Sequence, residues 1–168
     1  MDLSGFEAAL KAGRLEKAIY LLAGREDFLK ERLLERVARG LVPIEDHSEN
    51  VVRLDFGKQG FGDLNDRLGS FSFNPSRRLF FLFFPEELSA SERKKLPEIL
   101  GPGRVPPDSL VVLVTRESAV CAELQRGFGD RGERIDVWPP FENQLPAWVR
   151  KEASEMGVTM ALDAAEKL

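Results

Sequence analysis

Two uninterrupted apolar segments constrain the fold of this chain more than any other feature of its sequence. Residues 79–84 contain only leucine and phenylalanine, and residues 110–115 contain leucine, valine and one threonine. Short apolar runs without alternation are typical of strands that are buried on both faces. Because helices must then cover each face of the sheet, the two segments predict the centre of a parallel sheet in an α/β domain.

The other predicted strands and helices alternate along the chain. Apolar or alternating patterns predict three further strands, over residues 19–23, 51–55 and 134–138. Amphipathic patterns between the strands predict helices over residues 27–39, 61–68, 90–100 and 118–128. This alternation implies right-handed crossovers, so we expect a five-stranded, doubly wound parallel sheet with flanking helices.

The helix over residues 27–39 is expected to have an apolar face and a polar face. The apolar residues near one face are Phe28, Leu29, Leu33, Leu34 and Val37. The charged residues that mostly take the other face are Lys30, Glu31, Arg32, Glu35 and Arg36.

A domain boundary is predicted at the sequence Pro139-Pro140-Phe141. Residues 1–139 contain all the predicted strands, so we expect them to form the α/β domain. Residues 140–168 have only helical patterns, over 142–156 and 161–168, and are expected to begin a second, helical domain. The last pattern stops without an end signal, which favours a chain truncated from something longer.

The composition argues against several classes of function. The formal net charge is −4 and no long block of lysine and arginine occurs, which argues against an autonomous nucleic-acid-binding protein. Cys121 is the only cysteine and His47 the only histidine, so neither an internal disulfide nor a zinc cluster is expected. We interpret Cys121 as a small hydrophobic core residue in preference to a nucleophile, and residues 45–50 around His47 as a solvated loop.

No signal for secretion or membrane insertion is present. The chain begins with an acidic residue, Asp2, after Met1, and no apolar run reaches membrane-spanning length. We therefore expect a cytoplasmic protein.

The loop after the first strand is where a doubly wound sheet would bind phosphate. In the pattern G-x-x-x-x-G-K-[ST], Gly24 and Lys30 match, while Leu29 replaces the second glycine and Glu31 replaces the magnesium-binding hydroxyl. A leucine side chain hinders the approach of the loop amides to phosphate oxygens, and nearby acids repel a polyanion. The sequence therefore predicts a degenerate phosphate loop with no nucleotide, no metal and no other cofactor.

Other acids near this loop have ordinary structural interpretations. Glu26 and Asp27 are suited to stabilise the positive end of the helix dipole. At the end of the third strand an ATPase would carry an aspartate for magnesium and a glutamate for water, but residues 83–87 place a phenylalanine and a proline first. We interpret Glu86 and Glu87 as solvated loop acids.

Three segments resemble the delta subunit of the bacterial DNA polymerase III clamp loader. Residues 18–29 resemble its first strand, which runs into a Gly-x-Glu/Asp-x-x-Leu loop. Residues 72–86 resemble the end of its clamp-binding helix and its third strand. Residues 140–149 resemble the start of its second domain, where a Leu-x-x-Trp pattern opens the lid helix. The resemblance covers essentially the whole chain in the same order.

The resemblance implies a RecA/AAA+-like domain that has lost nucleotide binding, followed by the start of a small helical lid domain. It implies a subunit that binds and opens the sliding clamp for loading onto primed DNA during replication. No catalysis of its own is expected, although it would belong to a DNA polymerase holoenzyme. Its other implied partners are sister subunits, bound through a C-terminal domain that this chain lacks, and primed DNA indirectly, with no membrane.

The resemblance also implies where the clamp binds. Family members insert apolar side chains from the helix and turn before the third strand into a pocket on the clamp. The matching positions here are Phe71, Ser72, Phe73, Asn74 and Arg77, with Asn74 standing where the family has a second apolar residue. The neighbours of Phe73 signal an exposed loop, whereas Phe71 fits either an exposed anchor or a core position.

Two other classes of function stay open at this point. One is a divergent phosphate-loop ATPase or nucleotide kinase that uses Lys30 with Glu86 or Glu87. The other is a nucleic-acid-binding module, whose affinity would fall steeply with salt.

Overall fold

The computed structural model of the protein describes residues 1–69, 77–105, 109–155 and 157–158. The chain divides into two compact units, Met1–Val137 and Trp138–Leu168, and each is described by itself. All the strands of the described residues belong to the first unit.

The first unit is built on a sheet whose neighbouring strands are all parallel, in the order β2-β3-β4-β1-β5. The strands are β1 (Ile19–Ala23), β2 (Val51–Asp55), β3 (Leu79–Phe83), β4 (Leu110–Thr115) and β5 (Gly132–Asp136). The two apolar segments form the adjacent strands β3 and β4, which are buried along their whole length. The predicted five-stranded parallel α/β fold is therefore confirmed.

The fifth strand begins two residues earlier than predicted. Gly132, at its start, pairs with Ile19 of β1, so the ladder already includes Gly132 and Glu133, which precede the predicted strand. Val137 follows the strand and still donates its backbone N–H to the Ala23 carbonyl at 2.7 Å.

Helices lie in the connections between strands, as the alternating pattern predicted. The α-helices of the first unit are α1 (Leu3–Lys11), α2 (Asp27–Leu41), α3 (His47–Asn50), α4 (Phe56–Gln59), α5 (Gly62–Gly69), α6 (Ala90–Ile99) and α7 (Ser118–Phe128). Short 3-10 turns are η1 (Ile44–Asp46), η2 (Pro85–Glu87) and η3 (Gly129–Arg131). Residues 45–50 are thus helical, and the expectation of a loop there was wrong. His47 is half-buried and its Nε2 lies 3.0 Å from the Val42 carbonyl oxygen.

The unpredicted helix α1 has a clear local cause. The Asp2 carboxylate accepts the backbone N–H of Gly5 at 2.8 Å, which caps the first turn. Phe6 and Leu10, four residues apart, then lie on one face and are buried. The ring of Phe6 meets that of Tyr20 edge-on, with centroids 4.9 Å apart, so α1 packs against β1.

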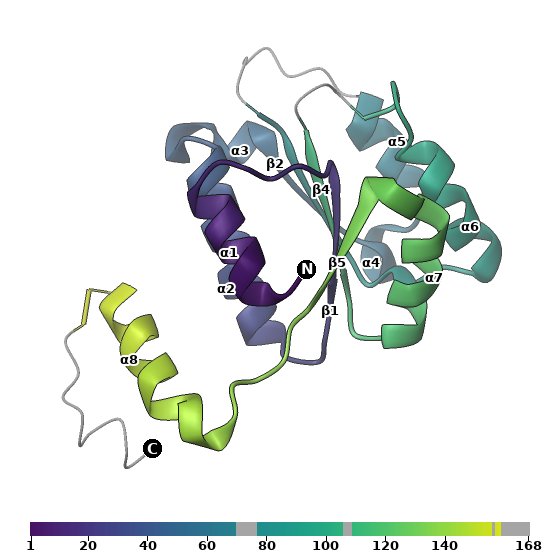
Figure 1. Ribbon diagram of the computed structural model, residues 1–168. Helices are drawn as coiled ribbons and strands as arrows, with labels where there is room; N and C mark the ends of the chain where they lie inside the picture. Colours follow the sequence, from purple (N-terminus) through teal and green to yellow (C-terminus); the bar gives the residue numbers. More distant parts are fainter. Residues whose placement is uncertain (70–76, 106–108, 156, 159–168) are drawn as a thin grey trace. The chain divides into compact units, whose positions relative to one another are not determined.

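The sheet is covered on both faces, as Figure 1 shows. Alternate strand residues belong to two separate cores, because successive side chains point to opposite faces. One core joins the sheet to α1 and α2, and the other joins it to α4, α5, α6 and α7. Cys121 of α7 is fully buried in the second core, and burial raises the pKa of its thiol to about 11. Its interpretation as a small hydrophobic residue is confirmed.

The second unit is helical in its described part. It contains the 3-10 turn η4 (Glu142–Gln144) and the helix α8 (Leu145–Glu155), within the helix predicted over residues 142–156. The pattern predicted over 161–168 lies outside the described residues.

Gly24, directly after β1, provides a test of the close pairing of β1 with β5. Its φ is +152°, and a Cβ atom there would lie 2.2 Å from the Val137 carbonyl oxygen. Because the obstacle is backbone of the β1–β5 pair, we expect Gly24→Ala to lower the free energy of unfolding by about 3 kcal/mol or more. Urea denaturation measures this change.

Gly13 supplies the matched control. It also has a positive φ, of +65°, but nothing lies within 4 Å of the added Cβ. Gly13→Ala should therefore cost only the backbone strain, about 1 kcal/mol. Equal losses in the two variants would show that the close approach to Val137 is unimportant.

Candidate functional site

The carboxyl ends of β1, β3 and β4 are adjacent in the sheet, and the residues that follow them form the candidate site. In a parallel sheet this edge is where ligands usually bind. Here β1 leads through Gly24 into α2, β3 leads into η2, and β4 ends at Thr115. The predicted phosphate loop, Glu86 and Glu87 therefore all belong to this edge.

Lys30 is the central residue of this edge. It is only 1% exposed, so its expected place on the polar face of α2 was wrong. Its Nζ donates to the Gly24 carbonyl at 2.6 Å and to the Thr115 carbonyl at 3.4 Å, and lies 3.0 Å from Asp27 Oδ1. An ammonium group has three N–H donors. The three acceptors, all from the chain itself, use all of them.

The spacing of the sequence explains why Lys30 is buried. Leu33, Leu34 and Val37 form the buried stripe of α2, and Lys30 precedes them by three, four and seven residues. These intervals place it at the start of the same stripe. Phe28, which we had assigned to the apolar face, is instead 60% exposed.

Asp27 is held by a second cation in addition to Lys30. Arg116, the residue after β4, donates from Nε to Asp27 Oδ2 at 3.1 Å and also binds it through Nη2. The Arg116 guanidinium lowers the pKa of the Asp27 carboxyl, with Lys30 acting in the same direction, and Asp27 raises the pKa of Arg116. Asp27 also lies in the first turn of α2, as expected for a helix-start acid.

The end of β3 is tied to the end of β4 by Glu86. Its carboxylate accepts the Thr115 hydroxyl at 2.7 Å and the Arg116 backbone N–H at 2.9 Å. Glu86 is half-buried and therefore not the solvated acid we expected, whereas Glu87 is exposed. Phe84 has a left-handed backbone, with φ of +56°, and its ring lies 4.4 Å from the Arg116 guanidinium carbon.

Leu29 and Glu31 complete the predicted loop. Leu29 is half-buried and packs against the core that contains α2. Both oxygens of Glu31 accept from Arg53 Nη2 of β2 at 2.7 Å, and that guanidinium lies 4.6 Å from the Phe83 ring centroid. The groups that occupy the loop are thus Lys30 and Asp27, while Leu29 faces the core.

The three cations described at this edge are already paired with carboxylates. Lys30, Arg116 and Arg53 are paired with carboxylates of α2, and no group of three or more His, Cys, Asp or Glu residues within the described ranges could hold a metal ion. A phosphate entering here would meet Asp27 beside Lys30 and Arg116. It would meet Glu31 beside Arg53.

The residues expected to bind the clamp precede β3 in the chain. Phe71, Ser72, Phe73 and Asn74 lie outside the described residues. Arg77 is described; it is half-buried and lies two residues before the first residue of β3.

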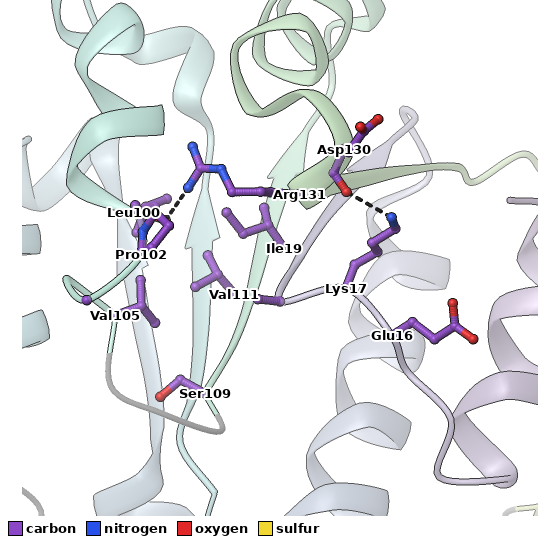
Figure 2. A pocket seen from close by; sticks show the side chains of 13 residues that line it. Glu16, Lys17, Ile19, Leu100, Pro102, Val105, Ser109, Val111, Asp130 and Arg131 are labelled. Atoms are coloured by element: carbon purple, nitrogen blue, oxygen red, sulfur yellow. Dashed lines mark hydrogen bonds between the residues drawn. The ribbon is translucent and has the colours of Figure 1, made fainter.

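A pocket of about 460 Å³ also lies at the amino edge, beside the first residues of β1 and β4 (Figure 2). Its wall includes Ile19, Val111 and Val105. The two basic side chains at the pocket donate to backbone: Lys17 Nζ donates to the Asp130 carbonyl at 2.8 Å, and Arg131 donates to the Leu100 carbonyl at 3.2 Å. Glu16, Asp130 and Ser109 also line the pocket.

Comparisons with known proteins support the fold. No protein-family model matches the chain, and no curated protein matches its sequence. Among solved structures, the DNA clamp loader delta protein of Bacillus subtilis superposes with a TM-score of 0.69 at 18% identity, covering 98% of this chain and 50% of that one. The chain thus spans about half the length of that protein.

Two other solved structures from Thermotoga maritima are similar. The RuvB Holliday junction branch migration motor has a TM-score of 0.60 at 23% identity, covering 95% of this chain and 50% of its own. A protein related to the gamma subunit of DNA polymerase III has a TM-score of 0.56 at 17% identity, covering 95% and 57%. The chain has the RecA/AAA+-like fold, and its resemblance to the clamp-loader delta subunit is confirmed at the level of the fold.

The charge pairing of Asp27 predicts a specific pH dependence. Its folded-state pKa is below the ordinary value of 3.8, so its stabilising effect is fully present above that value and is lost as the pH falls below it. The difference in unfolding free energy between the wild type and Asp27→Asn should stay constant from about pH 7 to about pH 5 and shrink below pH 3.8. Urea denaturation across this range measures it.

Asp63→Asn is the matched control, because Asp63 is an exposed acid in the first turn of α5. If both variants show the same pH profile, the effect belongs to any acid at a helix start, and the pairing with Lys30 and Arg116 does not cause it.

Proposed function

We propose that the chain is the front part of a clamp-loader delta subunit, which binds the sliding clamp and opens it for loading onto primed DNA. The observation that carries the proposal is the internal saturation of Lys30 at the edge where an AAA+ ATPase would hold its nucleotide. A RecA/AAA+-like domain whose central lysine is used in this way is suited to binding another protein without hydrolysis. The similarity in fold to a clamp-loader delta protein supports the same conclusion.

In this proposal the clamp contacts come from residues 71–77, which precede β3 in the chain. Phe73 is the main apolar anchor, with Phe71, Ser72, Asn74 and Arg77 around it. Aromatic side chains supply a large buried area with few rotatable bonds, which makes them effective anchors. Opening follows if this surface binds the open form of the ring more tightly than the closed form.

The remaining parts of the proposal concern the assembled loader. Residues 140–168 begin the lid domain, and sister subunits bind a further domain that follows it. The primed DNA is held by the whole assembly, in the cytoplasm. Among the described residues, no helix is long and apolar enough to cross a membrane.

The alternative is a divergent phosphate-loop ATPase or nucleotide kinase, which the similarity in fold to the RuvB motor favours. The two functions make opposite predictions for a calorimetric titration with ATP and magnesium. Because Lys30 has no donor left and Asp27 lies beside it, we expect no saturable heat at millimolar nucleotide. Saturable binding at micromolar concentration would support the ATPase or kinase alternative over the clamp-loader proposal.

The clamp proposal is tested directly by Phe73→Ala. We expect this change to abolish capture of the sliding clamp from the same organism, because it removes the central apolar anchor. The melting temperature should change by less than about 2 °C, since the sequence predicts an exposed loop around Phe73 and an exposed side chain contributes little to folding. Pull-down with purified clamp and a thermal melt measure the two effects.

Phe28→Ala is the matched control for that experiment. Phe28 is an exposed phenylalanine that lies at the carboxyl edge, at the start of α2. It should leave clamp capture unchanged. Normal capture by the Phe73→Ala variant would show that the anchor was assigned to the wrong residue.

A further inference from the structure

The residues expected to exclude phosphate from the loop after β1 have different partners in the structure. Leu29 is half-buried and packs against the core that contains α2. Both oxygens of Glu31 accept from Arg53 of β2. Asp27 is the residue whose carboxylate lies at the lysine, with Oδ1 3.0 Å from Lys30 Nζ. The exclusion of phosphate from Lys30 is therefore assigned to Asp27.

The Asp27 carboxylate is held by two kinds of donor that also bind oxyanions. The ammonium of Lys30 lies at one of its oxygens. Arg116 donates to the other oxygen from Nε at 3.1 Å and also from Nη2. A guanidinium edge and an ammonium make the same charge-assisted hydrogen bonds to phosphate oxygens as to a carboxylate. The donors around Asp27 are thus suited to a tetrahedral oxyanion.

These donors are within reach of solvent at the position of the carboxylate. The Lys30 side chain is only 2% exposed, whereas the Asp27 side chain is 49% exposed. The Arg116 side chain is exposed to a similar extent. An ion that took the place of the Asp27 carboxylate would therefore reach the buried ammonium from solution.

Removal of the Asp27 carboxylate would leave the ammonium without a counter-charge. Lys30 Nζ would keep the carbonyls of Gly24 and Thr115 as acceptors. A buried charge that has lost its partner is costly, so an anion from solution would be bound in its place.

Two other acids act on Arg116 less strongly than Asp27. The hydrogen bond from Asp27 is the main reason why the pKa of Arg116 is raised, and the charges of Glu86 and Asp55 contribute less. The Glu86 carboxylate also accepts the Thr115 hydroxyl and the Arg116 backbone N–H. Asp27 is therefore the principal acid at this pair of cations.

We propose that Asp27 is the internal occupant of an oxyanion site formed by Lys30 and Arg116, and that this autoinhibitory contact keeps inorganic phosphate out. The inference goes beyond clamp binding and does not depend on it. It also distinguishes Asp27 from Leu29 and Glu31, whose identities had suggested the loss of the site.

The test compares Asp27→Ala with the wild-type chain in phosphate buffer, with sodium chloride of equal ionic strength as the reference. We expect about 50 mM phosphate to raise the melting temperature of Asp27→Ala by about 3 °C or more, because an anion that binds only the folded state stabilises it. The wild type should show no difference between the two salts. Isothermal titration with phosphate should give saturable heat for the variant alone.

Glu31→Ala is the matched control, because it removes the same charge from the same helix and releases Arg53. It should show no saturable phosphate binding, since Arg53 is a single exposed cation. The double variant Asp27→Ala/Lys30→Met keeps the released Arg116 and removes the ammonium. Its response to phosphate should be lost.

Each of the other outcomes overturns the inference. Equal stabilisation of the wild type by phosphate would show that Asp27 does not close the site, and equal stabilisation of Glu31→Ala would show a general effect of charge. No response of Asp27→Ala would show that Lys30 and Arg116 do not form an oxyanion site. If Asp27→Ala does not fold, Asp27→Asn decides in the same way, since it removes the charge and keeps the shape. Clamp capture by the wild type is measured separately, so failure of the clamp proposal leaves these results unaffected.

Discussion

The carboxyl edge of the sheet depends on one buried ammonium group. Lys30 Nζ joins the carbonyl that follows β1 to the last carbonyl of β4, and holds Asp27 at the start of α2. A buried ammonium must have acceptors, since an unpaired charge in this position would cost several kcal/mol. A triphosphate could use Lys30 only after these contacts were broken and Asp27 displaced. In the structure the Lys30 ammonium is therefore paired with an internal carboxylate.

The surrounding ion pairs also reduce the attraction of this edge for phosphate. Asp27 and Glu31 are four residues apart on α2, and they pair with Arg116 after β4 and Arg53 on β2. Ion pairs this exposed contribute little to stability, because water and salt screen them. Their consequence is electrostatic, since they neutralise the two guanidinium groups, which would otherwise attract phosphate to this edge. Both guanidinium groups also lie over phenylalanines at the end of β3, which fixes their orientation.

The sequence predicted those elements whose cause is local. Strands β3 and β4 could be recognised because their residues are apolar on both faces, and four of the five strands begin where the pattern begins. The burial of Lys30 was also present in the sequence, in its spacing from Leu33 and Val37, but a lysine within a charged run gave the opposite impression. The contact of Glu86 with Thr115 could not be predicted. The two residues are 29 apart, and only the pairing of β3 with β4 brings them together.

The pairing of Lys30 and Arg116 with Asp27 at the carboxyl edge limits how the proposed clamp contact can be regulated. Strand β3 begins with Leu79 at the amino edge and ends with Phe83, just before Phe84 and Glu86 at the carboxyl edge. It is five residues long, about 16 Å at the usual rise of a strand. In a unit that binds nucleotide, ligand binding at one end of such a strand could favour one arrangement of the other end. A ligand shifts an equilibrium only by the difference between its affinities for the two states. Here Asp27 is the group that pairs with Lys30, and as part of the chain it is present in both states. Under the proposed function, clamp binding must therefore be controlled by contacts with other subunits, because Lys30 and Arg116 at this edge are already paired with Asp27.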